Sequence, residues 1–203
     1  MNSSSATNSD KNIRAEKKHL RRQFMTRRLA ISAAERMQTA EAIAQQLIKL
    51  PEWTPANYIA GYWATHGEVP LHIAQMRVQS PKVWCLPILQ TDKTLKFAPW
   101  RSGDPLVSNQ FGIPEPDISP SSALDATAIS MILLPLLAYT RTGTRLGMGG
   151  GYYDRSLAFR AARASPPLLI GVAYSSQEAD SLPNEEWDIK LDMLINEREV
   201  LRF

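Results

Sequence analysis

Met131-Ile-Leu-Leu-Pro-Leu-Leu-Ala-Tyr139 and the nearby stretch Arg145-Leu-Gly-Met-Gly-Gly-Gly-Tyr-Tyr-Asp-Arg155 decide the fold class of this chain. The first is an apolar run typical of a buried strand. The second holds four glycines, and a segment of helical character follows it over 152–164. A strand, a glycine-rich loop and a helix in this order can bind phosphate, because glycines let backbone N–H groups close on an anion and the helix N-terminus adds partial positive charge.

Other segments continue this pattern along the chain. The predicted strands are 58–64, 83–86, 94–99, 131–134, 168–174, 193–195 and 199–203, and 94–99 is expected at an edge because Pro99 ends it. Apolar strands separated by helices indicate an α/β fold with a largely parallel sheet, helices on both faces and three Rossmann-like layers. We expect a disordered polar tail over 1–10 and a single domain over 11–203.

Three helices are predicted upstream of the glycine loop. The first covers 12–30, and its expected inner stripe is Ile13, Leu20, Phe24, Met25 and Leu29. The second opens at the capping box Ser32-Ala-Ala-Glu35 and runs to Leu50. Its expected core residues are Met37, Ala40, Ile43, Ala44, Leu47 and Ile48. A short third helix is expected near 70–78, with proline early in it.

Charge is unevenly distributed although the net charge is only +3. Residues 1–36 hold nine Lys/Arg and three Asp/Glu, and the rest of the chain holds 14 and 17. A basic helix can bind nucleic acid, but a solvated face is the more common role of such a pattern. A third interpretation is that Lys17 and Arg21, one turn apart, point at the phosphates of a nucleotide.

Features that would place the chain in a membrane or outside the cell are absent from the sequence. The longest apolar run is too short to span a bilayer, and the first ten residues have no hydrophobic segment typical of a secretory signal. Cys85 is the single cysteine, so it forms no internal disulfide, and we expect a buried, inert thiol. We expect a cytoplasmic protein.

The glycine motif differs from the better-known phosphate loops. Tyr152 stands where the dinucleotide fingerprint needs a small residue, and the Gly-Lys-Ser/Thr of the Walker loop is absent. A mobile loop is the plain alternative. Against it, Arg141, Arg145 and Arg155 flank the glycines and could pair with phosphate oxygens, and Tyr152 and Tyr153 could cover a ring.

Sheet geometry predicts where further functional residues meet. Loops after 58–64, 131–137 and 168–174 should converge on one cleft at the carboxyl ends of the strands. They carry Trp63, Glu68, the glycine loop, Gln177 and Asp188. Each residue also has a purely structural interpretation: Trp63 in the core, Glu68 opening a helix, Asp188 in a solvated acidic loop. Asp154 is either a metal ligand or compensates a helix dipole. The three histidines lack metal-ligand spacing, and no acyl-transfer motif is present.

These stretches resemble the signature of the 5-formyltetrahydrofolate cyclo-ligase family, also called 5,10-methenyltetrahydrofolate synthetase. The resemblance extends from about Lys17 to the C-terminus. Besides the glycine motif, the matching pieces are Lys17-Lys-His-Leu-Arg21 with Arg28 and Ser32, Glu68, Leu86-Pro87, Gly112-Ile-Pro-Glu-Pro116, Gly171-Val-Ala-Tyr174, Gln177 and Asp188.

The resemblance implies an enzyme that uses ATP to phosphorylate the formyl oxygen of 5-formyltetrahydrofolate, after which N10 attacks and phosphate leaves. It assigns ATP binding to Lys17, Arg21, Arg145, Leu146, Gly147, Met148, Gly149, Gly150, Gly151, Tyr152 and Tyr153. It assigns folate binding to Trp63, Glu68, Met148, Gly149, Gly150, Gly151 and Tyr152. Arg145, Tyr152 and Glu68 are the implied catalytic residues, and Asp154 and Asp188 the implied ligands of Mg²⁺. Small molecules are then the partners, with no nucleic acid or membrane, and we expect a monomer.

Some positions depart from the family pattern. Met148 occupies a variable place, Glu186-Trp187 stands where bacterial members often have Pro-His, and Asn196 replaces a common threonine. The second of these departures lies directly before Asp188. Two alternatives stay open: a non-catalytic nucleotide- or RNA-binding relative, and a paralogue acting on another N-formyl substrate.

Overall fold

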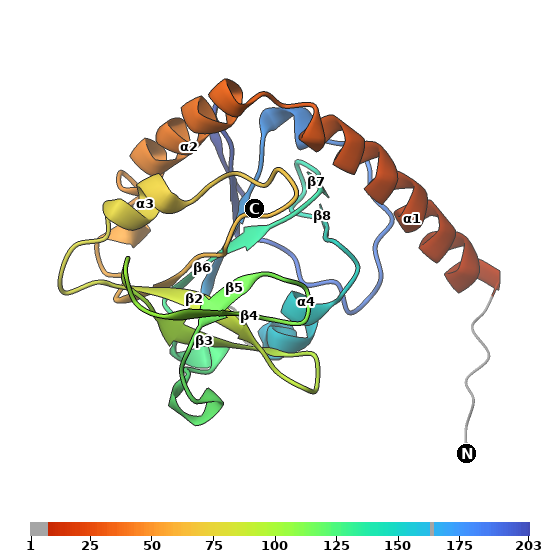
Figure 1. The fold of residues 1–203 in the computed structure, drawn as a ribbon. Coiled ribbons are helices and arrows are strands. Elements are labelled where there is room, and N and C mark those ends of the chain that lie inside the picture. The colour runs from red at the N-terminus through yellow and green to blue at the C-terminus, as the bar shows by residue number, and fades with distance from the viewer. Residues whose placement is uncertain (1–7, 163–164) are drawn as a thin grey trace, which may run out of the picture.

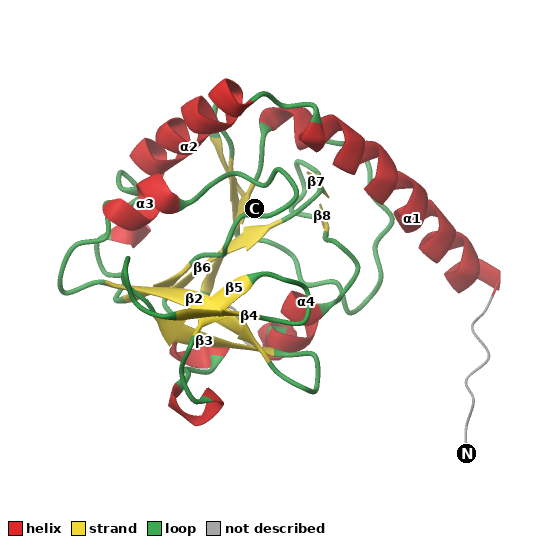
Figure 2. Ribbon diagram, in the orientation of Figure 1, coloured by secondary structure: helices red, strands yellow, loops and turns green. Residues whose placement is uncertain are grey.

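The computed structural model describes residues 8–162 and 165–203, and its centre is a seven-stranded sheet (Figure 2). The strand order is β11-β10-β9-β6-β1-β2-β3. The strands are β1 (Tyr58–Ala60), β2 (Val83–Leu89), β3 (Leu95–Pro99), β6 (Met131–Pro135), β9 (Leu168–Val172), β10 (Met193–Ile195) and β11 (Val200–Arg202). The five strands from β10 to β2 pair in parallel, and β3 and β11 add antiparallel edges. The predicted parallel sheet and the edge position of 94–99 are confirmed.

Helices cover both faces of this sheet, as expected for three layers. The α-helices are α1 (Asn8–Leu29), α2 (Ala33–Leu47), α3 (His72–Met76) and α4 (Tyr152–Ser156). In Figure 1, α1 and α2 form an arch over one side of the molecule, and α4 lies below the arch, to the right of β2 and β3. The 3₁₀ helices are η1 (Pro51–Trp53), η2 (Pro120–Ser122), η3 (Ala126–Ala128), η4 (Ala158–Ala161) and η5 (Ser175–Gln177). None of the described helices has the length and apolar character needed to cross a membrane.

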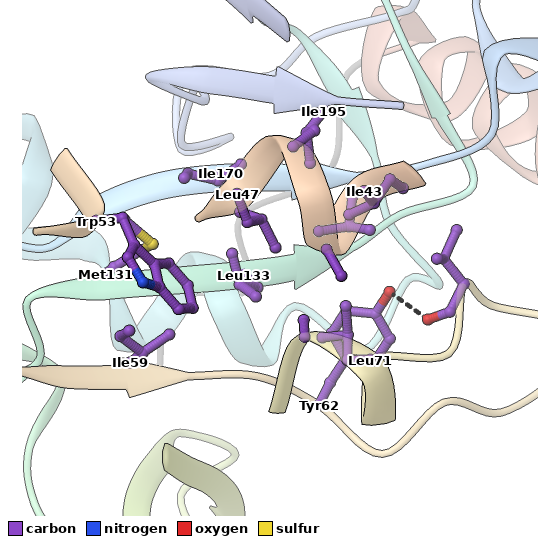
Figure 3. Packing of buried hydrophobic residues seen from close by; sticks show 14 of the residues in the cluster. Ile43, Leu47, Trp53, Ile59, Tyr62, Leu71, Met131, Leu133, Ile170 and Ile195 are labelled. Carbon is purple, nitrogen blue, oxygen red and sulfur yellow. Dashed lines mark hydrogen bonds between the residues drawn. The ribbon is translucent and has the colours of Figure 1, made fainter. Parts of the chain in front are cut away.

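The first core layer lies between α2 and the sheet. The capping box is present: Ser32 accepts from the Glu35 backbone, and the Glu35 carboxylate accepts from the Ser32 backbone. Ile43 and Leu47 are fully buried, and Figure 3 shows them over strand residues such as Leu133. Met37 is 45% exposed, so its predicted core position is wrong, because the buried stripe of α2 begins only at Thr39.

The predictions for the first helix and for the helix after the glycine loop need three corrections. Helix α1 begins at Asn8, so positions 8–10 of the predicted tail are helical, and 1–7 lie outside the described residues. Phe24 is buried, but Leu29 is 52% exposed because the helix ends there. The helix predicted over 152–164 is only α4 followed by η4, and 163–164 are not described. Ser156 Oγ donates to the Tyr152 carbonyl, a local bond that competes with helix continuation.

Two small hairpins were not predicted. β4 (Leu106–Ser108) pairs with β5 (Pro114–Pro116), where the sequence analysis predicted no strand. β7 (Ala138–Tyr139) pairs with β8 (Arg145–Leu146). The second hairpin matters for the site, because it places Arg145 at the entrance of the glycine loop.

Candidate active site

A cavity of about 880 Å³ lies where the loops after β1 and β6 leave the sheet. The third wall comes from residues 185–189, far along the connection after β9. The lining residues expected from the sequence are Lys17, Arg21, Trp63, Glu68, Arg145, Leu146, Gly147, Met148, Gly149, Gly150, Gly151, Tyr152, Tyr153, Asp154 and Asp188. The structure therefore brings together every residue assigned by the resemblance.

Two candidates from the sequence do not reach the cavity. Gln177 is 1% exposed and donates its side-chain N–H groups to the carbonyls of Leu136 and Leu137, so it braces the loop after β6. Arg141 pairs with Glu178 and Glu199 at the surface. Both predictions of a ligand contact are therefore replaced by structural roles.

The glycine loop has a backbone that only glycine adopts easily. Gly149 has φ +97° and Gly151 has φ +67°, where a side chain would be strained. A Cβ at Gly149 would also lie 3.1 Å from Cζ of Arg21. Arg21 donates from Nε to the Gly147 carbonyl over 2.9 Å, and Arg155 donates to the Gly150 carbonyl. Two arginines of the cavity lining thus fix the shape of the loop through its carbonyls.

Arg145 enters the cavity as a buried cation. It is 9% exposed, and its Nη2 donates to Oδ1 of Asp154 over 2.5 Å. Its buried Nε has no hydrogen-bond partner in the described structure. A buried guanidinium N–H without a partner is costly, and an anion in the cavity could satisfy it.

Asp154 and Asp188 lie on adjacent walls, each beside a cation. Asp154 Oδ1 also accepts from the backbone N–H of Ile189 over 3.2 Å, so the two segments meet. Lys17 Nζ lies 2.6 Å from Asp188 Oδ2 and 2.7 Å from Glu185 Oε2. The side chain of Lys17 is 7% exposed. Sequence analysis missed Glu185, whose acidic loop carried no sign of this contact with α1.

These carboxylates suit one kind of metal site. No group of three or more His, Cys, Asp or Glu converges among the described residues. Mg²⁺ does not need such a cage, because it is commonly held by one or two carboxylates together with phosphate oxygens and water. Both hydrogen bonds that Asp154 accepts end on Oδ1. Asp154 and Asp188 therefore fit a phosphate-dependent magnesium site.

Another part of the cavity lining combines aromatic rings with a buried acid. Trp63 packs edge-to-face on Trp100, with ring centroids 5.9 Å apart. Glu68 is 9% exposed, and its Oε2 accepts from the Thr65 backbone N–H over 2.9 Å. Burial raises the pKa of Glu68, and the hydrogen bond from Thr65 and the charge of Arg28 oppose that rise. Burial also raises the pKa of Tyr153, so its hydroxyl stays protonated and neutral.

Exposed apolar side chains surround the mouth of the cavity. Trp187 is 60% exposed, Phe111 58% and Met148 47%, and all three line it. Phe111 stands edge-to-face on Tyr152, with centroids 6.0 Å apart, and Gln110 donates to the Tyr152 hydroxyl. Phe111 and Gln110 belong to the turn of the β4–β5 hairpin, which the sequence did not reveal as a wall of the site.

The cavity joins a cationic, glycine-rich phosphate site to an aromatic wall with one acid. The first part suits the polyphosphate of a nucleotide. The second suits a flat heterocycle whose N–H groups can donate to Glu68.

Cys85 is fully buried away from this cavity, and burial raises its thiol pKa to about 12, so the prediction of an inert thiol agrees with the structure.

Known proteins resemble the chain over most of its length. The sequence profile of the 5-formyltetrahydrofolate cyclo-ligase family matches residues 13–197. The 5-formyltetrahydrofolate cyclo-ligase of Haemophilus influenzae is 32% identical over 185 residues, which cover 89% of this chain and 97% of that protein. The solution structure of Aquifex aeolicus 5,10-methenyltetrahydrofolate synthetase has a TM-score of 0.79 at 32% identity, covering 92% of each chain. The Mycoplasma pneumoniae 5,10-methenyltetrahydrofolate synthetase gives 0.68 at 26% identity, covering 90% of this chain and 99% of that one.

Proposed function

The chain belongs to the 5-formyltetrahydrofolate cyclo-ligase family, and we infer that it cyclises 5-formyltetrahydrofolate to 5,10-methenyltetrahydrofolate with ATP. One observation carries the inference beyond family membership. A single cavity holds both the glycine loop with the buried Arg145 and the wall with Glu68 and Trp63. A phosphoryl group and a folate ring bound to these two walls would meet in the same space.

We propose the following chemistry for the site. The γ-phosphoryl group passes from ATP to the formyl oxygen, and the bond to ADP breaks. The N10 lone pair then attacks the activated carbon, the carbon–oxygen bond breaks, and phosphate leaves as N10 loses its proton. Such a reaction needs mainly positioning and neutralisation of charge.

The cations of the chain have the role of holding phosphate oxygens. Asp154 holds Arg145 in place by accepting from its Nη2. The buried Nε has no partner among the described residues, so it can donate to a phosphate oxygen. Lys17 and Arg21 approach the same cavity from α1. Asp154 and Asp188 would hold Mg²⁺, which would offset charge on the γ-phosphate when bound. Tyr152 closes the glycine loop on the folate side.

Glu68 is proposed to orient the folate ring. Its Oε2 is occupied by Thr65, so Oε1 remains to accept from the pterin. A carboxylate in a buried site accepts strongly from ring N–H groups and rejects ligands that lack them.

The direct test is spectroscopic. Purified protein, Mg-ATP and 5-formyltetrahydrofolate are mixed, and the near-ultraviolet absorbance of the methenyl product is followed. The proposal requires growth of this band only when all three components are present. No growth from a folded protein that binds ATP would refute the folate substrate and leave only the nucleotide site. We further propose that the protein is cytoplasmic, in keeping with its single free, buried cysteine. We also propose that it is a monomer, and light scattering would measure its mass.

A further inference from the structure

We propose that Arg28 is a positioning residue that holds Glu68 and the glycine loop at one fixed spacing. The inference rests on the proposed folate reaction, in which those two parts bind the two substrates. Arg28 does not line the cavity. It would act through the groups that it holds rather than on the reacting atoms.

Arg28 joins the loops that form two walls of the cavity. It lies in the last turn of α1 and is 1% exposed. Its Nε donates to the His66 carbonyl and its Nη1 to the Leu136 carbonyl, each over 3.0 Å. The first carbonyl belongs to the loop after β1 and the second to the loop after β6. One planar guanidinium therefore fixes the distance between these loops.

The same guanidinium also reaches the groups assigned to the substrates. Nη1 lies 3.8 Å from Oε1 of Glu68, the oxygen that Thr65 leaves available. Nη2 lies 3.9 Å from Sδ of Met148 in the glycine loop. Thus Arg28 touches the acid on the folate wall and a side chain on the phosphate wall at once. A displacement of Arg28 would change their separation.

Arg36 provides a matched comparison close by. Its guanidinium donates to the carbonyls of Ile31 and Leu29 over 3.1 and 3.3 Å, so it also braces a loop through two backbone bonds. Among the described residues it forms no hydrogen bond or ion pair with Glu68 or Met148, and it does not line the cavity. A lysine at either position keeps the charge but loses the planar fork that holds two carbonyls.

Glu68 provides a readout that bracing alone would not move. Burial raises its pKa, and Arg28 is the nearby arginine that opposes the rise. The groups that face Glu68 come from several elements: Arg28 from α1, His66 and Tyr62 from the loop after β1, Tyr153 from α4 and Tyr174 from beyond β9. Loss of Arg28 removes a cation, so Glu68 should become protonated at a higher pH.

The experiment compares Arg28→Lys, Arg28→Met and Arg36→Lys with the wild type. We expect Arg28→Lys to lower kcat/KM for 5-formyltetrahydrofolate by about tenfold or more, with KM for ATP within about threefold. Arg36→Lys should stay within about threefold on both measures. The acidic limb of the pH profile for folate should move to higher pH in Arg28→Met.

A double-variant cycle tests the coupling directly, and Arg28→Lys replaces Arg28→Met in it if the methionine variant fails to fold. Arg28→Met combined with Glu68→Gln removes both buried charges together. In the Glu68→Gln background, loss of Arg28 should cost clearly less activity than in the wild type, because the two residues act as a unit. Independent, multiplying losses would overturn the proposal, as would equal kinetic defects in Arg28→Lys and Arg36→Lys.

A titration without turnover separates this inference from the proposed function. The ¹³C carboxyl signal of Glu68, assigned by its loss in Glu68→Gln, is titrated in the wild type and in Arg28→Met, which lacks the cation. A higher pKa in the variant supports the positioning role even if 5-formyltetrahydrofolate is not the substrate. An unchanged pKa and unchanged chemical shift refute it, whatever the substrate.

Discussion

Replacing Asp154 with asparagine would separate the structural and metal-binding roles of this carboxylate. In the structure Asp154 Oδ1 accepts from Arg145 Nη2 over 2.5 Å and from the Ile189 N–H over 3.2 Å. The amide oxygen of asparagine can occupy the same place and accept both bonds. The negative charge is lost, so a buried arginine loses its charged partner.

The structural cost follows from the burial of the pair. The side chains are 6% and 21% exposed for Arg145 and Asp154, so solvent screens them only weakly. Weakening a charge-assisted bond to a buried arginine costs about 1–3 kcal/mol. For a chain of this length, that corresponds to a fall in thermal midpoint of roughly 2–12 °C. The variant should therefore fold and remain suitable for assay at 25 °C.

The catalytic cost should be larger if Asp154 holds Mg²⁺. We expect kcat/KM for Mg-ATP to fall by about a hundredfold or more, since loss even of groups outside a metal's direct ligands costs about 10- to 100-fold. A thermal-shift assay with ADP gives a second measure. A ligand at 100 times its Kd stabilises the folded state by about 2.7 kcal/mol, and the Mg²⁺-dependent part should disappear in Asp154→Asn.

Asp192 supplies a close control. Its carboxylate accepts from Arg160 Nη2 over 2.6 Å and from the Leu169 N–H over 2.7 Å, and it does not line the cavity. Asp192→Asn should lose comparable stability but keep turnover and the Mg²⁺ response. Turnover of Asp154→Asn within about threefold of the wild type at saturating Mg²⁺ would refute the metal assignment. Equal losses in both variants would assign the effect to stability instead.

Three further predictions follow from individual side chains. Trp187→Ala should raise KM for ATP by about tenfold in steady-state kinetics and leave KM for folate unchanged. The reason is that an exposed indole next to Asp188 can stack on the adenine base. A change in KM for folate alone would contradict this prediction. Gly149→Ala should cost about 1–2 kcal/mol in urea unfolding, since φ is +97° and Arg21 is close, whereas Gly147→Ala, with its nearest contact at 3.8 Å, should be nearly neutral. Burial raises the Cys85 pKa to about 12, so the folded thiol stays protonated at pH values where an exposed thiol ionises. The free energy of unfolding should therefore fall as pH rises from about 8.5 toward 12. Iodoacetamide at pH 8 should label Cys85 only in unfolded protein, and rapid labelling of the native protein would show that the site opens.

The main sheet could be predicted because its strands are continuous apolar runs. Residues 131–134 and 168–172 have apolar side chains on both faces, which only a strand covered on both sides can bury. The capping box before α2 similarly has a local cause. The hairpins β4–β5 and β7–β8 have strands of only two or three residues, too short to show a periodic pattern. Their formation depends on the neighbouring structure.

The site was predictable in its members but not in its contacts. Ligand sites of parallel sheets lie at the carboxyl ends of the strands, and this rule correctly placed Glu68 and the glycine loop. It could not tell which residues of the long connection from β9 to β10 reach the cavity. That connection runs over residues 173–192, and its later part, not Gln177, reaches the cavity. The bond between Lys17 and Asp188 joins residues 171 positions apart. Arg28 matched the family pattern without an assigned role, because its partners are backbone carbonyls that no sequence pattern identifies.

The spatial arrangement of charges links the predicted ATP contacts to the predicted metal ligands. Arg145 pairs with Asp154, and Lys17 pairs with Asp188, so each ion pair joins one member of each set. All four charges are largely buried, and a buried charge without a partner is costly. A phosphate chain alone would bring negative charge beside both carboxylates. A phosphate chain with a divalent cation would supply a new partner to every member, because phosphate oxygens could pair with the cations and the carboxylates could hold the metal. The metal would also offset part of the negative charge that the phosphate chain brings, so we expect this arrangement to favour the metal–nucleotide complex over the free nucleotide.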